Sequence, residues 1–235
     1  MSNQQLNLPQ QLRLNKFLAE RLGISRREAD DLIVGGKVFV DDSVAVLGTR
    51  ISFDTIVRLG DEIIPFRNEY IYIMLNKPVG YVCSRKQQGD VPTVYELLPP
   101  KYQMLKTVGR LDKDSSGLIL FTNDGDFAYQ MTHPKFAKTK VYKVCLNRDL
   151  EPLHQQMIAD YGVKLDDGIS KFGLTRLDVG ETRREFEVTM SEGRNRQIRR
   201  TFAALGYEVK KLHRLSFGKY ELGDLKPGQI RLVTK

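Results

Sequence analysis

The sequence predicts an α+β protein in which a small αβ unit precedes a larger unit built on a mainly antiparallel, mixed sheet flanked by helices. Two short helical patterns lie near the N-terminus, strand-like alternation dominates from residue 71 onward, and strands and helices do not alternate regularly. The 235 residues, of which 41% are hydrophobic and 28% charged, are typical of a globular protein with a sizeable core. We expect a disordered tail over residues 1–10, the small unit over 11–68 and the larger unit over 69–235.

The small unit begins with two predicted helices. The first presents an apolar face and ends at Gly23; its apolar residues are Leu12, Leu14, Phe17, Leu18 and Leu22. Ser25 and Glu28 have the spacing of a capping box, which begins a second helix from Arg26 to about Val34. Short strands and turns are expected over residues 37–42 and 49–66.

The larger unit is dominated by strand patterns. They cover residues 70–78, 117–122, 140–146, 184–190, 207–222 and 229–234, and helical patterns cover 150–162 and 195–206. The tripeptide Asn-Asp-Gly at 123–125 follows an apolar run directly, so we interpret it as a hairpin turn.

The charge balance indicates an acidic partner. A net charge of +8 favours nucleic acid or an anionic membrane surface. No apolar run approaches the roughly 18 residues of a spanning helix, and the N-terminus lacks the pattern of a secretory signal. Two cysteines and three scattered histidines give no metal-ligand spacing. We therefore expect a cytoplasmic protein that binds neither a membrane nor a metal.

Basic residues crowd the two predicted helices of the small unit; among them are Arg13, Lys16, Arg26 and Arg27. A solvated charged face is one explanation of this pattern. We favour contact with RNA, because helix N-termini add positive potential to the same surface.

Charged residues gather just before the apolar run at 117–122. In the stretch "GRLDKDSSG", Asp112 and Asp114 are either turn-formers bonded to nearby amides or functional groups on a loop that a core strand holds. A magnesium-dependent nuclease built on the two aspartates is a weaker alternative. The stretch "EGRNRQIRR" predicts a helix that buries Ile198, and Arg199 at the edge of its apolar stripe needs an anionic partner.

Two further segments carry open interpretations. Pro78 and Gly80 break a strand just after Lys77, which by itself indicates a turn. Tyr142 lies in the basic strand "KVYKV". It either packs in the sheet or offers a stacking surface to an unpaired base.

Together these motifs resemble one family. "NKPVG", "GRLDKDSSGLILFTNDGD", "KVYKV" and "EGRNRQIRR" followed by "ALG" look like the successive motifs of RsuA-type ribosomal RNA pseudouridine synthases, and the small unit resembles the S4 RNA-binding module. The resemblance covers nearly the whole chain from residue 11. Ser115 stands where many members have threonine, and both residues keep a hydroxyl.

The resemblance implies roles for single residues. Asp112 would be the catalytic aspartate, Arg199 its ion-pair partner, and Tyr142 would stack on the target uracil, while Ile198 packs against the base and Arg110 holds the target nucleotide out of the RNA. Lys113, Asn195, Arg196 and Gln197 would contact the RNA. The site should be dry, with the neighbouring arginine keeping the buried carboxylate ionised.

The resemblance also implies a reaction and partners. The reaction would isomerise a uridine of ribosomal RNA to pseudouridine through attack on the sugar, attack on the base or removal of a sugar proton. No cofactor is expected, because the reaction needs no redox partner or group donor. We expect a monomer that acts on ribosomal RNA or an assembly intermediate, with the ribosomal subunit left open. The alternative is an S4-type RNA-binding assembly chaperone without essential catalysis.

Overall fold

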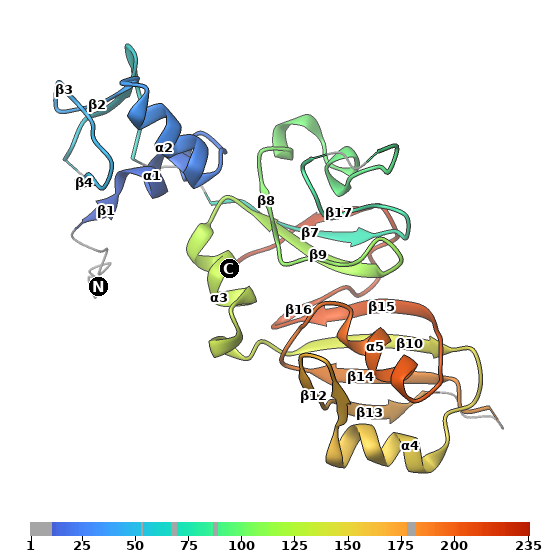
Figure 1. Cartoon of the computed structure of the whole chain (residues 1–235). Coiled ribbons are helices and arrows are strands. Elements are labelled where there is room, and N and C mark those ends of the chain that lie inside the picture. The colour runs from blue at the N-terminus through green and yellow to red at the C-terminus, as the bar shows by residue number, and fades with distance from the viewer. Residues whose placement is uncertain (1–10, 53, 67–69, 87–88, 178–181) are drawn as a thin grey trace, which may run out of the picture. The chain divides into compact units, whose positions relative to one another are not determined.

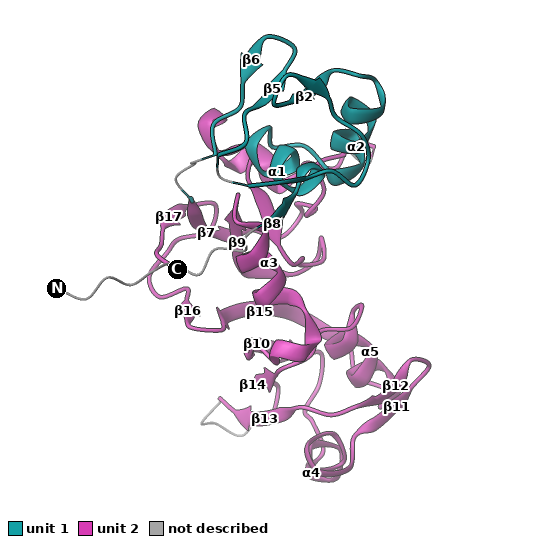
Figure 2. Ribbon diagram, turned by 90° about the vertical axis from the view of Figure 1, so that its left-hand side faces the viewer, with its two compact units in different colours: residues 1–70 teal, residues 71–235 magenta. Residues whose placement is uncertain are grey.

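The computed structural model describes residues 11–52, 54–66, 70–86, 89–177 and 182–235. The chain divides into two compact units, residues 1–70 and 71–235 (Figure 1, Figure 2). The tail expected over 1–10 and the boundary expected between 68 and 69 both lie outside the described residues.

The first unit combines two helices with short strands. Its elements are β1 (Leu12–Arg13), α1 (Leu14–Arg21), α2 (Arg26–Val34), β2 (Val38–Val40), β3 (Ser43–Val44), β4 (Arg50–Ile51), β5 (Val57–Leu59) and β6 (Glu62–Ile63). Strands β3, β2, β5 and β6 form one antiparallel sheet, and β1 pairs with β4. Phe17, Leu18, Ala29 and Val38 are buried in a core between the helices and this sheet.

The start of α2 agrees with the start predicted from the sequence, whereas that of α1 differs. The capping box of α2 is confirmed: the amide of Glu28 donates to Ser25 Oγ at 3.1 Å and the amide of Ser25 donates to Glu28 Oε2 at 2.6 Å. The first helix begins later than its apolar face suggests, because Leu12 pairs with Ile51 in a strand.

The second unit is built around one mixed sheet. Within its described residues the helices are α3 (Gly125–Thr132), α4 (Pro152–Gln156) with a π-helical turn (Met157–Tyr161), α5 (Gln197–Ala204) and three 3-10 turns (Val94–Leu97, Pro100–Tyr102, Pro134–Phe136). The strands are β7 (Tyr72–Lys77), β8 (Lys106–Val108), β9 (Ser116–Thr122), β10 (Lys140–Leu146), β11 (Val163–Leu165), β12 (Gly168–Ser170), β13 (Gly173–Arg176), β14 (Glu185–Met190), β15 (Val209–Phe217), β16 (Tyr220–Glu221) and β17 (Ile230–Leu232).

The sheet order is β13-β14-β10-β15-β9-β7-β17, with β16 on β15 and β8 on β9. Every strand pair in it is antiparallel except β15 with β9. The structure thus confirms the predicted α+β class with a mainly antiparallel mixed sheet.

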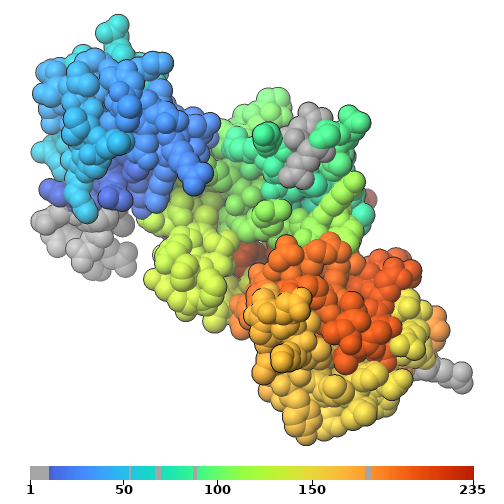
Figure 3. Space-filling model, in the orientation of Figure 1, coloured from blue at the N-terminus to red at the C-terminus, as the bar shows by residue number. Residues whose placement is uncertain are grey.

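Both faces of the sheet are covered. Alternate residues of β7 and β9 point to opposite sides, as the period of a strand requires. Ile73, Ile119 and Phe121 belong to the core that includes Ile198 and Phe202 of α5. Tyr72, Met74 and Leu120 belong to the core that includes Phe127 and Met131 of α3. In the space-filling view α5 lies against the segment around β11 (Figure 3).

The hairpin turn expected at 123–125 is wrong. Asp124 is instead the N-cap of α3, because its side chain accepts a hydrogen bond from the amide of Phe127 at 2.9 Å. The carboxylate also accepts the hydroxyl of Tyr72 at 2.8 Å, which fixes the start of the helix against β7.

Gly117 lets β9 and β15 approach each other closely. Its φ of +106° is a conformation that side chains rarely adopt, and a Cβ atom there would lie 2.3 Å from the carbonyl oxygen of Arg214. This glycine therefore permits the parallel pairing of β9 with β15 at Arg214.

Candidate active site

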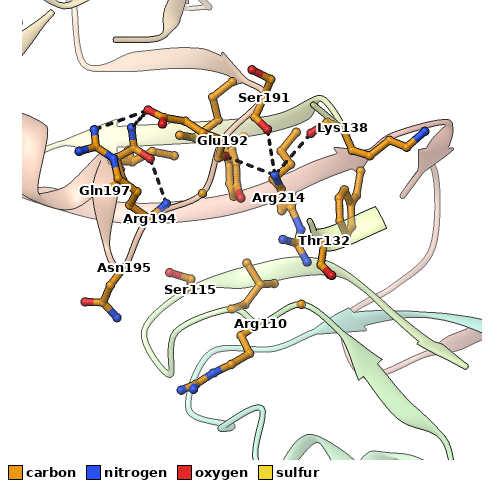
Figure 4. A pocket seen from close by; sticks show the side chains of 18 of the residues that line it. Arg110, Ser115, Thr132, Lys138, Ser191, Glu192, Arg194, Asn195, Gln197 and Arg214 are labelled. Carbon is orange, nitrogen blue, oxygen red and sulfur yellow. Dashed lines mark hydrogen bonds and ion pairs between the residues drawn. The ribbon is translucent and has the colours of Figure 1, made fainter. Parts of the chain in front are cut away.

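A pocket of about 400 Å³ opens in the second unit. Five segments line it: the loop between β8 and β9, the end of α3, the start of β10, the connection from β14 to α5, and β15. Figure 4 shows Arg110 and Ser115 on one side of it and Ser191, Glu192 and Arg194 on the other. Basic side chains outnumber carboxylates in the lining; they are Arg110, Lys138, Lys140, Arg194, Arg196 and Arg214, against Asp112 and Glu192.

The β8–β9 loop carries Asp112 into this pocket. A fully buried lysine, Lys77 at the end of β7, holds the loop by donating to the carbonyl oxygens of Asp112 at 3.0 Å, Ser115 at 2.6 Å and Pro78 at 3.0 Å. Burial lowers the pKa of Lys77. The amide of Gly80 donates to the Lys113 carbonyl at 2.8 Å, so the strand break after Lys77 is tied to the same loop.

The expected pair of Asp112 with Arg199 is wrong. Arg199 lies with Nε 3.2 Å from a carboxylate oxygen of Asp114, and its other donors bind the carbonyls of Asp114 at 2.8 Å and Val209 at 2.7 Å. The arginine nearest to Asp112 is Arg196, at 3.5 Å. The backbone folds the loop so that Asp114, two residues on, meets Arg199.

Arg196 joins the two aspartates. Its guanidinium makes two hydrogen bonds of 3.0 Å to the carboxylate of Asp114, and it is the N-cap of α5 with a left-handed φ of +45°. The hydrogen bond from Arg196, with the nearby charge of Arg199, lowers the pKa of Asp114. Such a backbone conformation is costly for a side-chain-bearing residue and is concentrated at functional sites.

Asp112 is less buried than expected. Its side chain keeps 32% of its surface accessible, because it stands at the rim of the open pocket. The carboxylate of Asp112 is thus accessible from the pocket, whereas that of Asp114 forms ion pairs with Arg196 and Arg199.

The remaining arginines of "EGRNRQIRR" hold the pocket wall together. Arg194 donates to Asp167 Oδ1 at 2.8 Å and Arg200 donates to Asp167 Oδ2 at 2.6 Å. Gln197, expected to contact RNA, is buried; its amide bonds Ser170 and Glu192 and accepts from the amide of Arg194. These contacts fix the loop that leads into α5.

One wall of the pocket is apolar. Tyr142 on β10, Ile198 on α5 and Leu212 on β15 are each buried and line it. A bulge between Val141 and Tyr142 shifts the register of β10 against β15, so that Tyr142 lies opposite Arg214. The sequence allowed Tyr142 either to pack in the sheet or to stack on a base. In the structure its ring lies in the sheet and also borders the pocket.

The other predicted residues fall into two groups. Arg110 and Asn195 line the pocket and are exposed, whereas Lys113 is exposed but does not line it. The residues predicted to bind RNA in the first unit are Arg13, Lys16, Arg26 and Arg27, of which all but Lys16 are exposed.

Two residues of the site were missed. Lys77 was interpreted only as part of a turn, although it ends a strand that begins with an apolar run, which is a signal of a buried cation. Arg214 occupies an inward position of β15, two residues after Leu212, and is 2% exposed. An arginine in the inward register of a strand is the signal that could have found it.

Neither a metal nor a membrane is indicated by the described part of the chain. Among its residues, no three His, Cys, Asp or Glu side chains gather where they could hold a metal ion. Its helices are all too short or too polar to cross a membrane.

Comparison with known proteins identifies the fold and the chemistry. The sequence pattern of the RNA pseudouridylate synthase family matches residues 71–204, and that of the S4 domain matches residues 12–63. The chain belongs to the RNA pseudouridylate synthase family. It is an enzyme, an RNA isomerase, and the resemblance found in the sequence is confirmed.

Individual relatives match over nearly their whole length. The chain is 37% identical to ribosomal small subunit pseudouridine synthase A of Pasteurella multocida, covering 95% of this chain and 96% of the relative. It is 36% identical to ribosomal large subunit pseudouridine synthase B of Buchnera aphidicola, over 95% and 94%. A crystal structure of a pseudouridylate synthase matches with 34% identity and a TM-score of 0.67, over 95% and 96%.

Proposed function

We propose that this enzyme converts a specific uridine of ribosomal RNA to pseudouridine, with Asp112 as its catalytic aspartate. The observation that carries the proposal is that Asp112 and Tyr142 border one pocket of about 400 Å³ in whose lining basic side chains outnumber carboxylates. A volume of this size suits a single nucleotide. The names of the curated relatives place their substrates in ribosomal RNA of either subunit, which supports the same class of substrate here.

The pocket requires that the target nucleotide leaves its stack. A uridine inside a duplex cannot reach a carboxylate on a loop, so the base must turn out of the RNA. We infer that the uracil lies on the ring of Tyr142 with Ile198 beside it, and that Arg110 and Arg196 face the phosphates on either side.

The reaction moves the ribose from one atom of the uracil to another. The bond between C1′ and N1 breaks, the uracil turns and a bond from C1′ to C5 forms. The C5 proton then leaves to water, and N1 takes up a proton in its place. Asp112 starts this sequence by attacking C1′, by attacking the base, or by removing a sugar proton. Each route conserves atoms and electrons without an added cofactor.

The basic face of the first unit is proposed to hold the RNA outside the pocket. Arg13, Arg26 and Arg27 are exposed, and the last two open helix α2. Contacts of this kind are made with phosphates and carry no sequence information. We expect the enzyme to act as a monomer in the cytoplasm.

Tritium release tests the proposal. Transcripts of small- and large-subunit ribosomal RNA, and assembly intermediates, are labelled at uridine C5 and incubated with the enzyme. We expect about one tritium released per RNA by the wild type and none by Asp112→Ala, with equal RNA affinity. Asp160→Ala, a change of an exposed aspartate outside the pocket, is the matched control. Tight binding without release by the wild type would instead indicate an RNA-binding assembly factor.

A further inference from the structure

Arg214 is the most deeply buried arginine side chain that faces the pocket. It is 2% exposed and lines the pocket, where Figure 4 shows it among the other lining side chains. Its Nε donates to the carbonyl of Leu118 at 2.7 Å, and its guanidinium lies 5.0 Å from the ring centre of Phe217. These contacts hold one edge and one face of the group in place.

One nitrogen of the guanidinium lacks a partner. Its Nη2 is buried and has no hydrogen-bond acceptor within the described residues. No carboxylate of the described residues lies within ion-pair distance of Arg214. The four arginines between residues 194 and 200, in contrast, each form an ion pair with an aspartate. A buried cation without an anion is unfavourable, so its position needs an explanation outside the resting protein.

The charge of Arg214 acts on two nearby lysines, of which Lys140 lines the pocket. It contributes to the lowered pKa of Lys140 and of Lys77, although burial is the larger cause for both. Lys140 itself donates to three carbonyls around the pocket rim, those of Lys138, Ser191 and Glu192. Arg214 is therefore the buried cation of the pocket lining, and its buried Nη2 has no protein acceptor among the described residues.

The register of the sheet places Arg214 beside the expected position of the base. Tyr142 and Arg214 are direct partners across β10 and β15, and both side chains line the pocket. Side chains of directly paired residues stand on the same face of a sheet. A uracil that lies on Tyr142 brings its edge, with the oxygens O2 and O4, within reach of the guanidinium.

Negative charge develops on that uracil whichever route Asp112 takes. If the carboxylate attacks C1′, or if a sugar proton is removed, the electron pair of the C1′–N1 bond stays on the departing uracil and spreads onto its oxygens. If the carboxylate adds to the base, the electron pair of the broken ring double bond moves to O4. On all three routes a cation at the oxygens of the base stabilises the charge that develops.

We propose that Arg214 is a catalytic residue that donates a hydrogen bond to a uracil oxygen and stabilises the negative charge that develops on the base. The proposal rests on the proposed function of the site. A cation held in a fixed position needs no reorganisation as the charge appears, which is the condition under which such groups are most effective.

The test separates chemistry from binding. Single-turnover tritium release and RNA affinity are measured for Arg214→Ala, Arg214→Met and Arg214→Lys. Loss of the guanidinium should lower the rate constant about 100- to 1,000-fold while RNA affinity changes less than threefold. Arg214→Lys should retain more activity than Arg214→Met, because it keeps the charge. Arg183→Met is the matched control, since Arg183 also donates its Nε to a backbone carbonyl, that of Leu150, but lies away from the pocket.

Chemical rescue distinguishes a catalytic cation from a structural one. Guanidinium chloride at millimolar concentration should restore part of the rate of Arg214→Ala, whereas urea and sodium chloride should not. Equal rescue by urea, or an unchanged rate in Arg214→Met, would overturn the proposal. A loss of affinity as large as the loss of rate, with a shallower salt dependence, would overturn it in favour of a phosphate contact. If the wild type itself released no tritium, the proposed function would fail first.

Discussion

The guanidinium of Arg199 lies 3.2 Å from a carboxylate oxygen of Asp114 and also donates to the carbonyl of that residue. With the two hydrogen bonds from Arg196, this makes Asp114 the anchor of the β8–β9 loop. Asp112, two residues earlier, stays at the rim of the pocket and 3.5 Å from Arg196. Asp114 therefore holds the loop in place, whereas the carboxylate of Asp112 stays accessible from the pocket.

Replacing Lys77 with methionine should loosen this loop. Lys77 satisfies three carbonyls in the protein interior, and the loss of their donor leaves them without a partner. We expect the free energy of unfolding to fall by about 1–3 kcal/mol, measured by urea denaturation. Lys164→Met, a change of an exposed lysine on β11, should have little effect. An equal loss in both variants would show that the buried contacts contribute nothing.

Substitution of Gly117 should disturb the crossing of β9 and β15. An added Cβ would lie 2.3 Å from the Arg214 carbonyl oxygen, and the backbone must keep φ at +106°. We expect Gly117→Ala to destabilise the protein by about 2–4 kcal/mol in thermal or urea unfolding. The control is Gly173→Ala on β13, where a new Cβ meets its nearest atom at 3.6 Å. Similar unfolding curves for the two variants would refute the close approach.

The first unit should contribute electrostatic affinity alone. Arg26 and Arg27 are the first two residues of α2 and are exposed. Each phosphate contact that is lost reduces the slope of the logarithm of the binding constant against the logarithm of salt concentration by about 0.7–0.9. The double change to alanine should weaken binding at low salt and reduce the slope by about 1.5, without altering the reaction rate of bound RNA. Arg58→Ala serves as control, because Arg58 already pairs with Asp42 at 2.6 Å. An unchanged slope would show that α2 does not contact the RNA.

Acid should weaken the anchor of the loop. The hydrogen bond from Arg196 lowers the pKa of Asp114 below its ordinary value of 3.8 in the folded protein. The unfolded chain thus takes up this proton first, so the stabilisation by Asp114 is present above pH 3.8 and is lost as the pH falls below it. Unfolding of the wild type and Asp114→Asn from pH 7 to pH 3 measures this. The advantage of the wild type should shrink only in the acid range, and a constant difference would contradict the assignment.

The sequence predicted local features better than long-range pairings. The capping box of α2 depends on residues three apart, and the structure confirms it. Asp124 shows the limit of local patterns, since the same tripeptide suits a hairpin turn or a helix N-cap. In the structure it caps α3, and its carboxylate also accepts from Tyr72, 52 residues away. The α+β class followed from the strand patterns and was confirmed.

The candidate site was predicted as a set of residues rather than as a set of contacts. Asp112, Tyr142 and Ile198 line one pocket, while their roles in the reaction stay predictions. The partner of Arg199 was assigned wrongly, because the choice between Asp112 and Asp114 depends on how the loop folds. Lys77 and Arg214 were missed because their burial depends on carbonyls from distant segments: Asp112, Ser115 and Leu118.

The most direct test compares Asp112→Asn with Asp114→Asn by single-turnover tritium release from C5-labelled ribosomal RNA at saturating enzyme. We predict no measurable release by Asp112→Asn, because no carboxylate then reaches the base or the sugar. We predict reduced but measurable release by Asp114→Asn, whose amide still accepts from Arg196. Release by Asp112→Asn at a rate close to that of the wild type would contradict a catalytic role for Asp112.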